Sequence, residues 1–390
     1  MEKKLPTIPR EEYPQRWEKV QSILADSRLD LLLAYSDDRL TYGNAYARYF
    51  ADLPAPFEDV LTMFLPGREP ALLVGPETIG FAQERSAIRD IHVLAEFAAD
   101  DEDYPFTTVE PLRDVAVRCA GTAVKRVGIA GKVRMGAELF AAIAAAFPDA
   151  ELVDVNKPLE LLRGVKSPAE LEVIRYAYRI TNLGMDAALA ALRPGVTERE
   201  IAAEAEYVMR RAGAEGVGID TIVASGPNAY HILAKTTTRA IEPDDVVVLT
   251  FAPRYEGYHG ACGRTALVGN PGEASVQAVE AAIRAQELCG RNLLPGKTGS
   301  SVEAMGRQVM GEAGYGENFL YSGLHSVGVI EFEPPILGPS SSTVIAENMV
   351  ISVDIPLFEA KIPGVRMEDG YLITADGPQQ LTAAPRMIRK

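Results

Sequence analysis

The sequence predicts an α+β protein of two domains, an α/β domain over residues 1–157 and a second domain over residues 158–390. Two observations carry this prediction. In the first part, short apolar runs alternate with amphipathic helical runs, which is typical of an α/β domain. In the second part, one sequence pattern occurs twice, which indicates two related halves that enclose a cleft.

The elements of the first domain follow from hydrophobic spacing and from Pro and Gly punctuation. Residues 16–29 have the spacing of an amphipathic helix, and residues 30–36 are a short apolar run of strand length. The same alternation of strand-like and helical runs continues over 57–67, 70–77, 77–87, 125–132 and 136–150. A helix is predicted to begin near the start of the second domain. Ser167 is a suitable N-cap, Pro168 takes the first helical position, and acids lie in the first turn.

The internal repeat of the second domain is set by two matching turns. The turn L-R-P-G-V-T has its proline at 194 and L-L-P-G-K-T has its proline at 295, an offset of 295 − 194 = 101 residues. Each half predicts a helix, this turn, an amphipathic helix and a glycine stop. A histidine follows each half, His231 and then His325. Further matches at the same offset are Ile201 with Val302, Val208 with Val309, Met209 with Met310, and Ala212-Gly213 with Ala313-Gly314.

Composition restricts the partners. A formal net charge of −15 and a pI near 4.9 disfavour nucleic acid and anionic membrane surfaces as partners. The three cysteines are odd in number and widely spaced, which argues against a disulfide framework and fits a reducing cytoplasm. We see no secretory leader and no apolar run of membrane-spanning length.

The run from Val247 to Thr265, VVLTFAPRYEGYHGACGRT, predicts a strand, a tight turn and a second strand. It resembles the metal-binding hairpin of the creatinase/aminopeptidase P/methionine aminopeptidase superfamily, D-F-G-x-x-x-x-G-Y-x-x-D-x-x-R-T. Thr250 and Ala261 stand at the two aspartates that bind metal in that family. The resemblance implies a "pita-bread" domain preceded by a creatinase-like α/β domain. It also implies a homodimer, with the first domain of the neighbouring chain near the cleft.

Three later motifs extend the resemblance to the other ligand positions. His325 and Glu368 keep two of them, and Asp354 replaces a glutamate with a shorter carboxylate. Phe332 takes the place of a histidine that contacts substrate in the peptidases of the family. Because two of five positions are lost, we expect this set not to hold two metal ions.

The leading hypothesis is therefore a metal-independent, creatinase-like hydrolase without a cofactor, cleaving a C–N bond in an amidine, guanidine or amide metabolite. His231 follows a G-P-N run that resembles the approach to creatinase's catalytic histidine, and would act as general base and then acid. Glu368 and Asp354 would bind the cationic substrate, and His325 would orient water or the leaving group. In creatinase, two glutamates hold the guanidinium group of the substrate. Glu368 matches one of them, but Gly263 stands at the position of the other. The residues expected to bind substrate are Asp354, His259, Tyr258, Phe332, Arg366 and Thr250.

Two alternatives stay open from the sequence. A single-metal, Xaa-Pro-type peptidase could use His325, Asp354 and Glu368 as ligands. A protein with this fold could also bind a ligand without chemistry. The sequence decides neither the substrate nor whether the reaction would be a hydrolysis or a lyase reaction.

Overall fold

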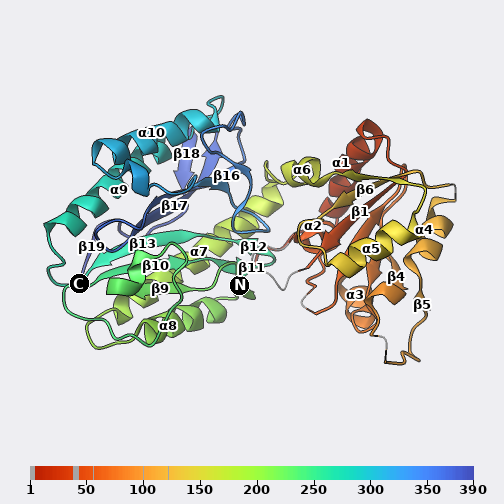
Figure 1. Cartoon of the computed structure of the whole chain (residues 1–390), viewed down its shortest axis with the longest axis horizontal. Coiled ribbons are helices and arrows are strands. Elements are labelled where there is room, and N and C mark those ends of the chain that lie inside the picture. The colour runs from red at the N-terminus through yellow and green to blue at the C-terminus, as the bar shows by residue number, and fades with distance from the viewer. Residues whose placement is uncertain (1–4, 38–43, 56, 100, 122) are drawn as a thin grey trace. The chain divides into compact units, whose positions relative to one another are not determined.

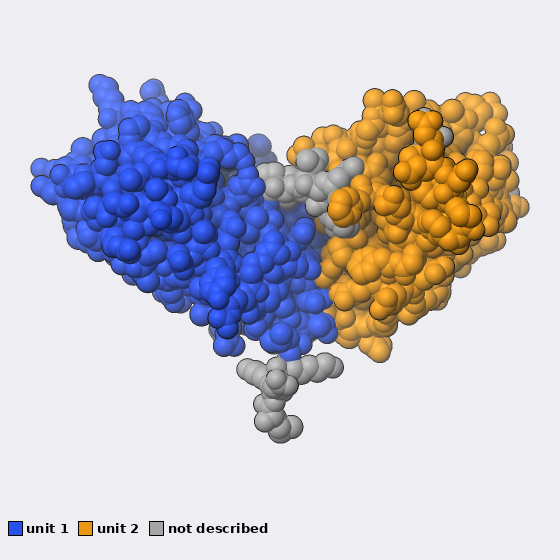
Figure 2. Space-filling model, turned by 90° about the horizontal axis from the view of Figure 1, so that it is seen from below, with its two compact units in different colours: residues 1–7, 163–390 blue, residues 8–162 orange. Residues whose placement is uncertain are grey.

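The computed structural model describes residues 5–37, 44–55, 57–99, 101–121 and 123–390. The chain forms two compact units, one of residues 8–162 and one of residues 1–7 and 163–390, which Figure 2 shows in different colours. The sequence-based boundary at 157/158 falls five residues before this division. Within the described part, none of the helices combines the length and the apolar character that a membrane span requires.

The unit of residues 8–162 is built on a seven-stranded mixed sheet with helices packed around it (Figure 1). The strand order is β5-β4-β3-β2-β1-β6-β7, in which β2 runs antiparallel to both neighbours and the other pairs are parallel. Its strands are β1 Leu31–Ser36, β2 Val60–Phe64, β3 Ala71–Val74, β4 Asp90–Leu94, β5 Val109–Glu110, β6 Arg126–Ala130 and β7 Glu151–Asp154. Its helices are α1 Glu12–Asp26, α2 Tyr46–Ala51, α3 Ile79–Arg85, α4 Leu112–Ala120, α5 Ala137–Ala146 and α6 Asn156–Leu161.

The larger unit places two helix pairs beside one curved sheet, which is antiparallel except where β19 pairs with β13 (Figure 1). The strand order is β15-β14-β16-β17-β13-β10-β9, with β18 on β17 and β19 on β13. The helices are α7 Pro168–Ala191, α8 Glu198–Arg211, α9 Glu273–Asn292 and α10 Gly299–Glu312. The sheet strands are β9 Ile222–Ser225, β10 Val246–Phe251, β13 Cys262–Leu267, β14 Leu324–Ser326, β15 Glu333–Ile336, β16 Val350–Leu357, β17 Val365–Thr374, β18 Gly377–Gln380 and β19 Ile388–Arg389. A small separate sheet consists of β8 Gly216–Val217, β11 Pro253–Tyr255 and β12 Tyr258–His259.

The two halves of this unit repeat in detail. Thr197 precedes α8 and Thr298 precedes α10, and each forms an isolated bridge, to Ala240 and to Val344. Both helices end on an alanine with nearly identical backbone angles, and each alanine is followed by a glycine with positive φ. The two halves meet where β13 pairs with β17. The repeat read from the sequence is therefore present in the backbone.

Glu198, the first residue of α8, organises the loop that carries His231. Its buried carboxylate accepts hydrogen bonds from the backbone and hydroxyl of Ser225 (both 2.7 Å), the amide of Asn228 (2.9 Å), and the backbone (2.8 Å) and hydroxyl (2.7 Å) of Thr237. An acid is also favoured at this end of a helix by the macrodipole. One carboxylate thus fixes three points of the segment from 225 to 237.

We predict that Glu198→Ala lowers the free energy of unfolding by roughly 3–5 kcal/mol, because several buried donors lose their charged acceptor together. Urea unfolding followed by circular dichroism measures this change. The matched control is Glu200→Ala two residues later, whose exposed carboxylate only completes a capping box with Thr197. Its expected cost is about 1 kcal/mol. Equal losses in the two variants would contradict the role assigned to Glu198.

Candidate active site

The ligand positions of the second domain line up across the middle of the large sheet. Thr250 on β10 lies opposite Gly263 on β13, Gly263 lies opposite Glu368 on β17, and Glu368 lies opposite Asp354 on β16. Residues directly opposite in antiparallel strands share one face, so these side chains project to the same side. Gly263 keeps the row open, because a Cβ there would stand 2.7 Å from Cγ of Arg366.

Arg366 places a buried positive charge beside this row, where it contacts the residues at both ends, Thr250 and Asp354. Its guanidinium donates to Thr250 Oγ1 at 3.2 Å and to the Tyr321 hydroxyl at 3.0 Å, and its Nε lies 3.6 Å from Asp354 Oδ1. The Tyr321 hydroxyl in turn donates to the other oxygen of Asp354. Burial opposes the charge of Arg366, but Tyr321, Asp354 and Glu368 hold its pKa above the ordinary value. The guanidinium therefore stays charged and tied to Asp354.

Glu368, in the middle of the row, lies close to a histidine and a second acid. One donor atom from each of His325, Glu331 and Glu368 lies within 4.8 Å of the other two, and all three residues are buried. His325 Nε2 is 3.9 Å from Glu368 Oε1, and the Ser352 hydroxyl donates to that same oxygen at 2.7 Å. Glu331 arrives from the bend between β14 and β15.

His325 is oriented as a metal-binding histidine would be. Its Nδ1 lies 3.1 Å from the carbonyl oxygen of Ser326. Because a carbonyl oxygen can only accept a hydrogen bond, Nδ1 carries the proton. The lone pair of Nε2 therefore points towards Glu368. Burial lowers the pKa of His325 to about 4, so the imidazole is neutral at neutral pH. The ring of Phe332 stacks on it with centroids 4.0 Å apart and fixes its plane.

The three acids disfavour one another's charge. Burial raises the pKa of Glu331 to about 7, and the neighbouring charge of Asp354 adds to the shift. Burial also raises the pKa of Glu368, with further contributions from Asp354 and Glu331. The pKa of Asp354 is raised by burial as well, although Arg366 and Tyr321 oppose that shift. A cation between the carboxylates would relieve this repulsion.

These residues fit one divalent cation and not two. An imidazole nitrogen and two carboxylates within a few ångströms form an accepted ligand set for Mn²⁺, Fe²⁺, Co²⁺ or Zn²⁺. A second ion would need the positions of Thr250 and Ala261, which offer a hydroxyl and a methyl group, and it would meet the guanidinium bonded to Thr250. We therefore derive no step through a two-metal centre.

The remaining residues predicted to lie in the site are placed elsewhere or at its border. His231 is exposed at the end of a 3₁₀ turn, while the carbonyl of the next residue, Ile232, accepts a hydrogen bond from Arg366. Tyr258 is buried and donates to Glu170 at the start of α7. His259 is buried, its Nδ1 lies 3.0 Å from the Gly328 carbonyl, and its Nε2 has no hydrogen-bond partner among the described residues.

Sequence reasoning did not assign a role in the site to three residues. Glu331 contributes a carboxylate, Ser352 holds Glu368, and Tyr321 links Arg366 to Asp354. For Glu331 there was a signal, since an acid inside the apolar run V-G-V-I-E-F is costly to bury unless it has a partner. The tyrosine and the serine carry no such signal.

Comparison with known proteins places this geometry in a family. The model of metallopeptidase family M24 matches residues 172–375, and that of the Creatinase/Prolidase N-terminal domain matches residues 16–165. The chain belongs to metallopeptidase family M24. Its two-domain fold, with a creatinase-like first domain and a pita-bread second domain, is confirmed.

Three similar proteins illustrate the relationship. An Xaa-Pro dipeptidase of Pyrococcus furiosus is 34% identical over 238 residues, which are 61% of this chain and 68% of the relative. The crystal structure of the prolidase from Pyrococcus horikoshii OT3 superposes with a TM-score of 0.82 at 26% identity, covering 95% of this chain and 99% of that one. The X-Pro aminopeptidase from Thermotoga maritima superposes with a TM-score of 0.79 at 26% identity, covering 96% and 99%.

These relatives overturn the leading sequence hypothesis. A metal-independent, creatinase-like hydrolase of non-peptide C–N bonds was wrong, because the similar proteins are Xaa-Pro dipeptidases, which act on peptide bonds. The physical error lay in counting only the family's ligand positions. Two of those positions are lost, but the bend after β14 brings another carboxylate, Glu331, beside His325 and Glu368.

The buried His259 makes stability depend on pH in a way that a variant can isolate. Burial lowers its pKa to about 3, with a smaller contribution from Arg254. The unfolded chain, with a histidine pKa of about 6.5, therefore binds the proton first, and the folded state loses stability as pH falls from about 6.5 towards 3. This one group changes the unfolding free energy by up to about 1.4 kcal/mol per pH unit in that window.

We predict that His259→Asn removes this contribution. Denaturant unfolding of both proteins at a series of pH values gives the difference in unfolding free energy. As pH falls below about 6.5, the free energy of unfolding of the unmodified protein should decrease more steeply than that of the variant. The difference between the two proteins should therefore narrow or change sign. The buried acids act with the opposite sign, since their raised pKa values stabilise the folded state at low pH, but they are common to both proteins. Parallel curves for the two proteins would show that His259 does not titrate in this way.

Proposed function

We propose that the chain is a peptidase that cleaves Xaa-Pro-type dipeptides and uses one divalent metal ion. The observation that carries this proposal is the buried set of His325, Glu331 and Glu368, with donor atoms within 4.8 Å of one another. Support for the substrate class comes from the relatives, several of which are Xaa-Pro dipeptidases.

Charge balance favours one ion. With Asp354, Glu331 and Glu368 ionised and Arg366 protonated, the buried site carries two net negative charges. One divalent cation neutralises them, whereas two would leave an excess of two positive charges in a region without bulk water. The guanidinium thus limits the site to a single ion. When bound, such an ion polarises a carbonyl and lowers the pKa of a water molecule.

The chain's own residues prepare the site for a peptide. Ser352 holds one oxygen of Glu368, and the Ser326 carbonyl holds the proton of His325 away from the ligand atom. Arg366 and Tyr321 hold Asp354 out of the ligand set. Phe332 presents an apolar, half-buried ring beside His325, where a pyrrolidine ring packs better than a charged side chain.

A second candidate function is favoured by the presence of Thr250 and Ala261 at the two positions where the family has aspartates. A site with fewer carboxylates stabilises less charge during peptide hydrolysis, so the fold could serve as a dipeptide-binding protein without turnover. Binding of an Xaa-Pro dipeptide with no hydrolysis in the presence of metal identifies this case.

Assembly and location follow from the family resemblance. We infer a homodimer in which the first domain of the neighbouring chain lies near the site, acting on a small-molecule substrate in the cytoplasm. Light scattering coupled to gel filtration tests the dimer, because a monomer mass at micromolar concentration would exclude it.

We predict that the purified protein hydrolyses Ala-Pro in the presence of Mn²⁺ or Co²⁺ and loses this activity on chelation. Glu331→Gln and Glu368→Gln each remove a charged ligand at nearly constant volume. Because loss of an outer-shell partner already costs 10- to 100-fold, we expect each variant to lose more than about 100-fold in metal affinity and in turnover.

The matched control is Glu347→Gln, which makes the same chemical change at an exposed position. It should keep the metal affinity and the turnover of the unmodified chain. Full activity after chelation, or full activity in Glu331→Gln, would contradict the single-metal proposal. Metal binding without any turnover would favour the binding protein.

A further inference from the structure

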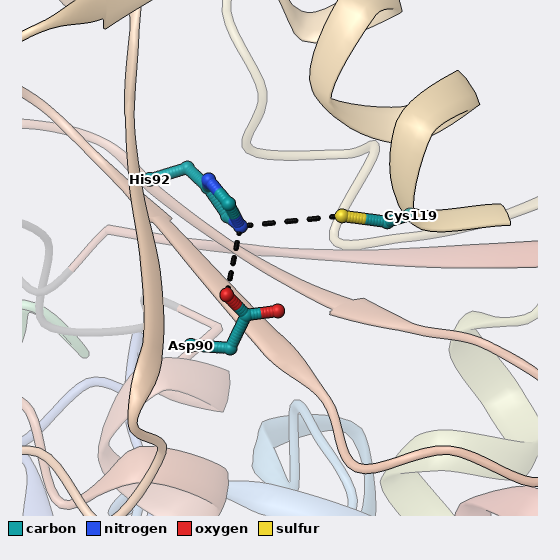
Figure 3. Close-up of side chains that lie close together, drawn as sticks. All are labelled: Asp90, His92 and Cys119. Atoms are coloured by element: carbon teal, nitrogen blue, oxygen red, sulfur yellow. Dashed lines mark hydrogen bonds and ion pairs between the residues drawn. The ribbon is translucent and has the colours of Figure 1, made fainter.

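We propose that the unit of residues 8–162 carries a second metal site, formed by Asp90, His92 and Cys119, for a borderline divalent cation such as Zn²⁺. One donor atom of each residue lies within 4.8 Å of the other two. Figure 3 shows Asp90 and Cys119 both directed at the same ring nitrogen of His92. The site belongs to the other unit and does not depend on the proposed peptidase function.

Two elements build the site. Asp90 and His92 are alternate residues of β4, so their side chains project from the same face of the strand. Cys119 lies in the last turn of α4. The Asp90 carboxylate is 2.9 Å from His92 Nε2, and the Cys119 sulfur is 4.0 Å from that same nitrogen.

This arrangement is better suited to binding a metal ion than to nucleophilic catalysis by Cys119. In a cysteine–histidine–acid catalytic group, the acid orients the histidine through the ring nitrogen remote from the sulfur. Here the Asp90 carboxylate and the sulfur both approach Nε2 (Figure 3). The acid on the side of Nδ1, Glu110, is 3.8 Å away, which is longer than the hydrogen bond that would orient a catalytic histidine.

The donor set and the spacing fit zinc. Thiolate, imidazole and carboxylate are all common zinc ligands, with bond lengths of about 2.0–2.3 Å, which place neighbouring donors roughly 3.3–3.7 Å apart in a tetrahedron. The observed separations of 2.9 and 4.0 Å lie on either side of that range. Asp90 can adjust, because 60% of its side chain is exposed, and the open side leaves room for water as the fourth ligand.

The charged groups around His92 Nδ1 influence which of the two ring nitrogens carries the proton. His92 Nδ1 lies 3.4 Å from Arg118 Nη2 and 3.8 Å from Glu110 Oε2. Arg118 can only donate, so it favours a proton on Nε2, where an ion would bind. Glu110 is beyond hydrogen-bond distance, but its negative charge favours a proton on Nδ1, which is the form a metal ligand requires, and such nearby carboxylates raise metal affinity.

The experiment uses the full-length protein stripped of metal and titrated with Co²⁺, whose bonds to thiolates give a near-ultraviolet charge-transfer band. We expect this band to appear in the unmodified protein, to saturate at one equivalent of Co²⁺ in the His325→Ala variant, and to disappear in Cys119→Ser. It should persist in Cys289→Ala, which removes a different thiol, and in His325→Ala, which alters the candidate active site. No band, or a band that survives Cys119→Ser, would overturn the site.

Competition of Zn²⁺ with a chromophoric chelator then tests the surrounding charges. Glu110→Gln should weaken Zn²⁺ binding roughly 10- to 100-fold. Arg118→Gln should strengthen it, because the change removes a positive charge and the donor that favours the non-binding form of His92. The two residues form an ion pair in which Arg118 is exposed and Glu110 is partly exposed, so folding should tolerate either change. Unchanged or oppositely changed affinities would show that the ion does not bind His92 Nε2 and would overturn the site.

Discussion

The candidate site depends on the buried guanidinium of Arg366. It donates to Thr250 and Tyr321 and pairs with Asp354, so a fixed positive charge lies beside the position where the family resemblance places metal ligands. Two carboxylates are lost at Thr250 and Ala261 and one is added by Glu331, so among the described residues Asp354, Glu331 and Glu368 balance one divalent ion in addition to the guanidinium. The chemistry proposed for the chain is limited by that charge balance.

The fold explains why these groups meet. The repeat places β13 and β17 side by side at the junction of the two halves, and the register carries one row of residues from Thr250 through Glu368 to Asp354. A glycine at 263 leaves space in the row for Arg366. Glu198 in the first half holds the segment that follows β9, so the backbone at Ile232 reaches Arg366 as well.

Much of this could be predicted from the sequence. The repeat offset is present in the backbone. The motifs assigned His325, Asp354 and Glu368 to the site, and the structure puts them on the adjacent strands β14, β16 and β17. Periodicity does not determine how far a long side chain reaches, so the pairing of Arg366 with Asp354 was not foreseen. Glu331 lies in a bend without periodicity, and Tyr258 reaches Glu170 because of local packing.

The most direct test is anomalous diffraction from crystals soaked in Mn²⁺, recorded near the manganese edge. One peak among His325 Nε2, Glu331 and Glu368, with Arg366 still paired to Asp354, is the result expected here. Two peaks a few ångströms apart, with the guanidinium displaced from Thr250, would contradict the claim that this charge limits the site to one ion.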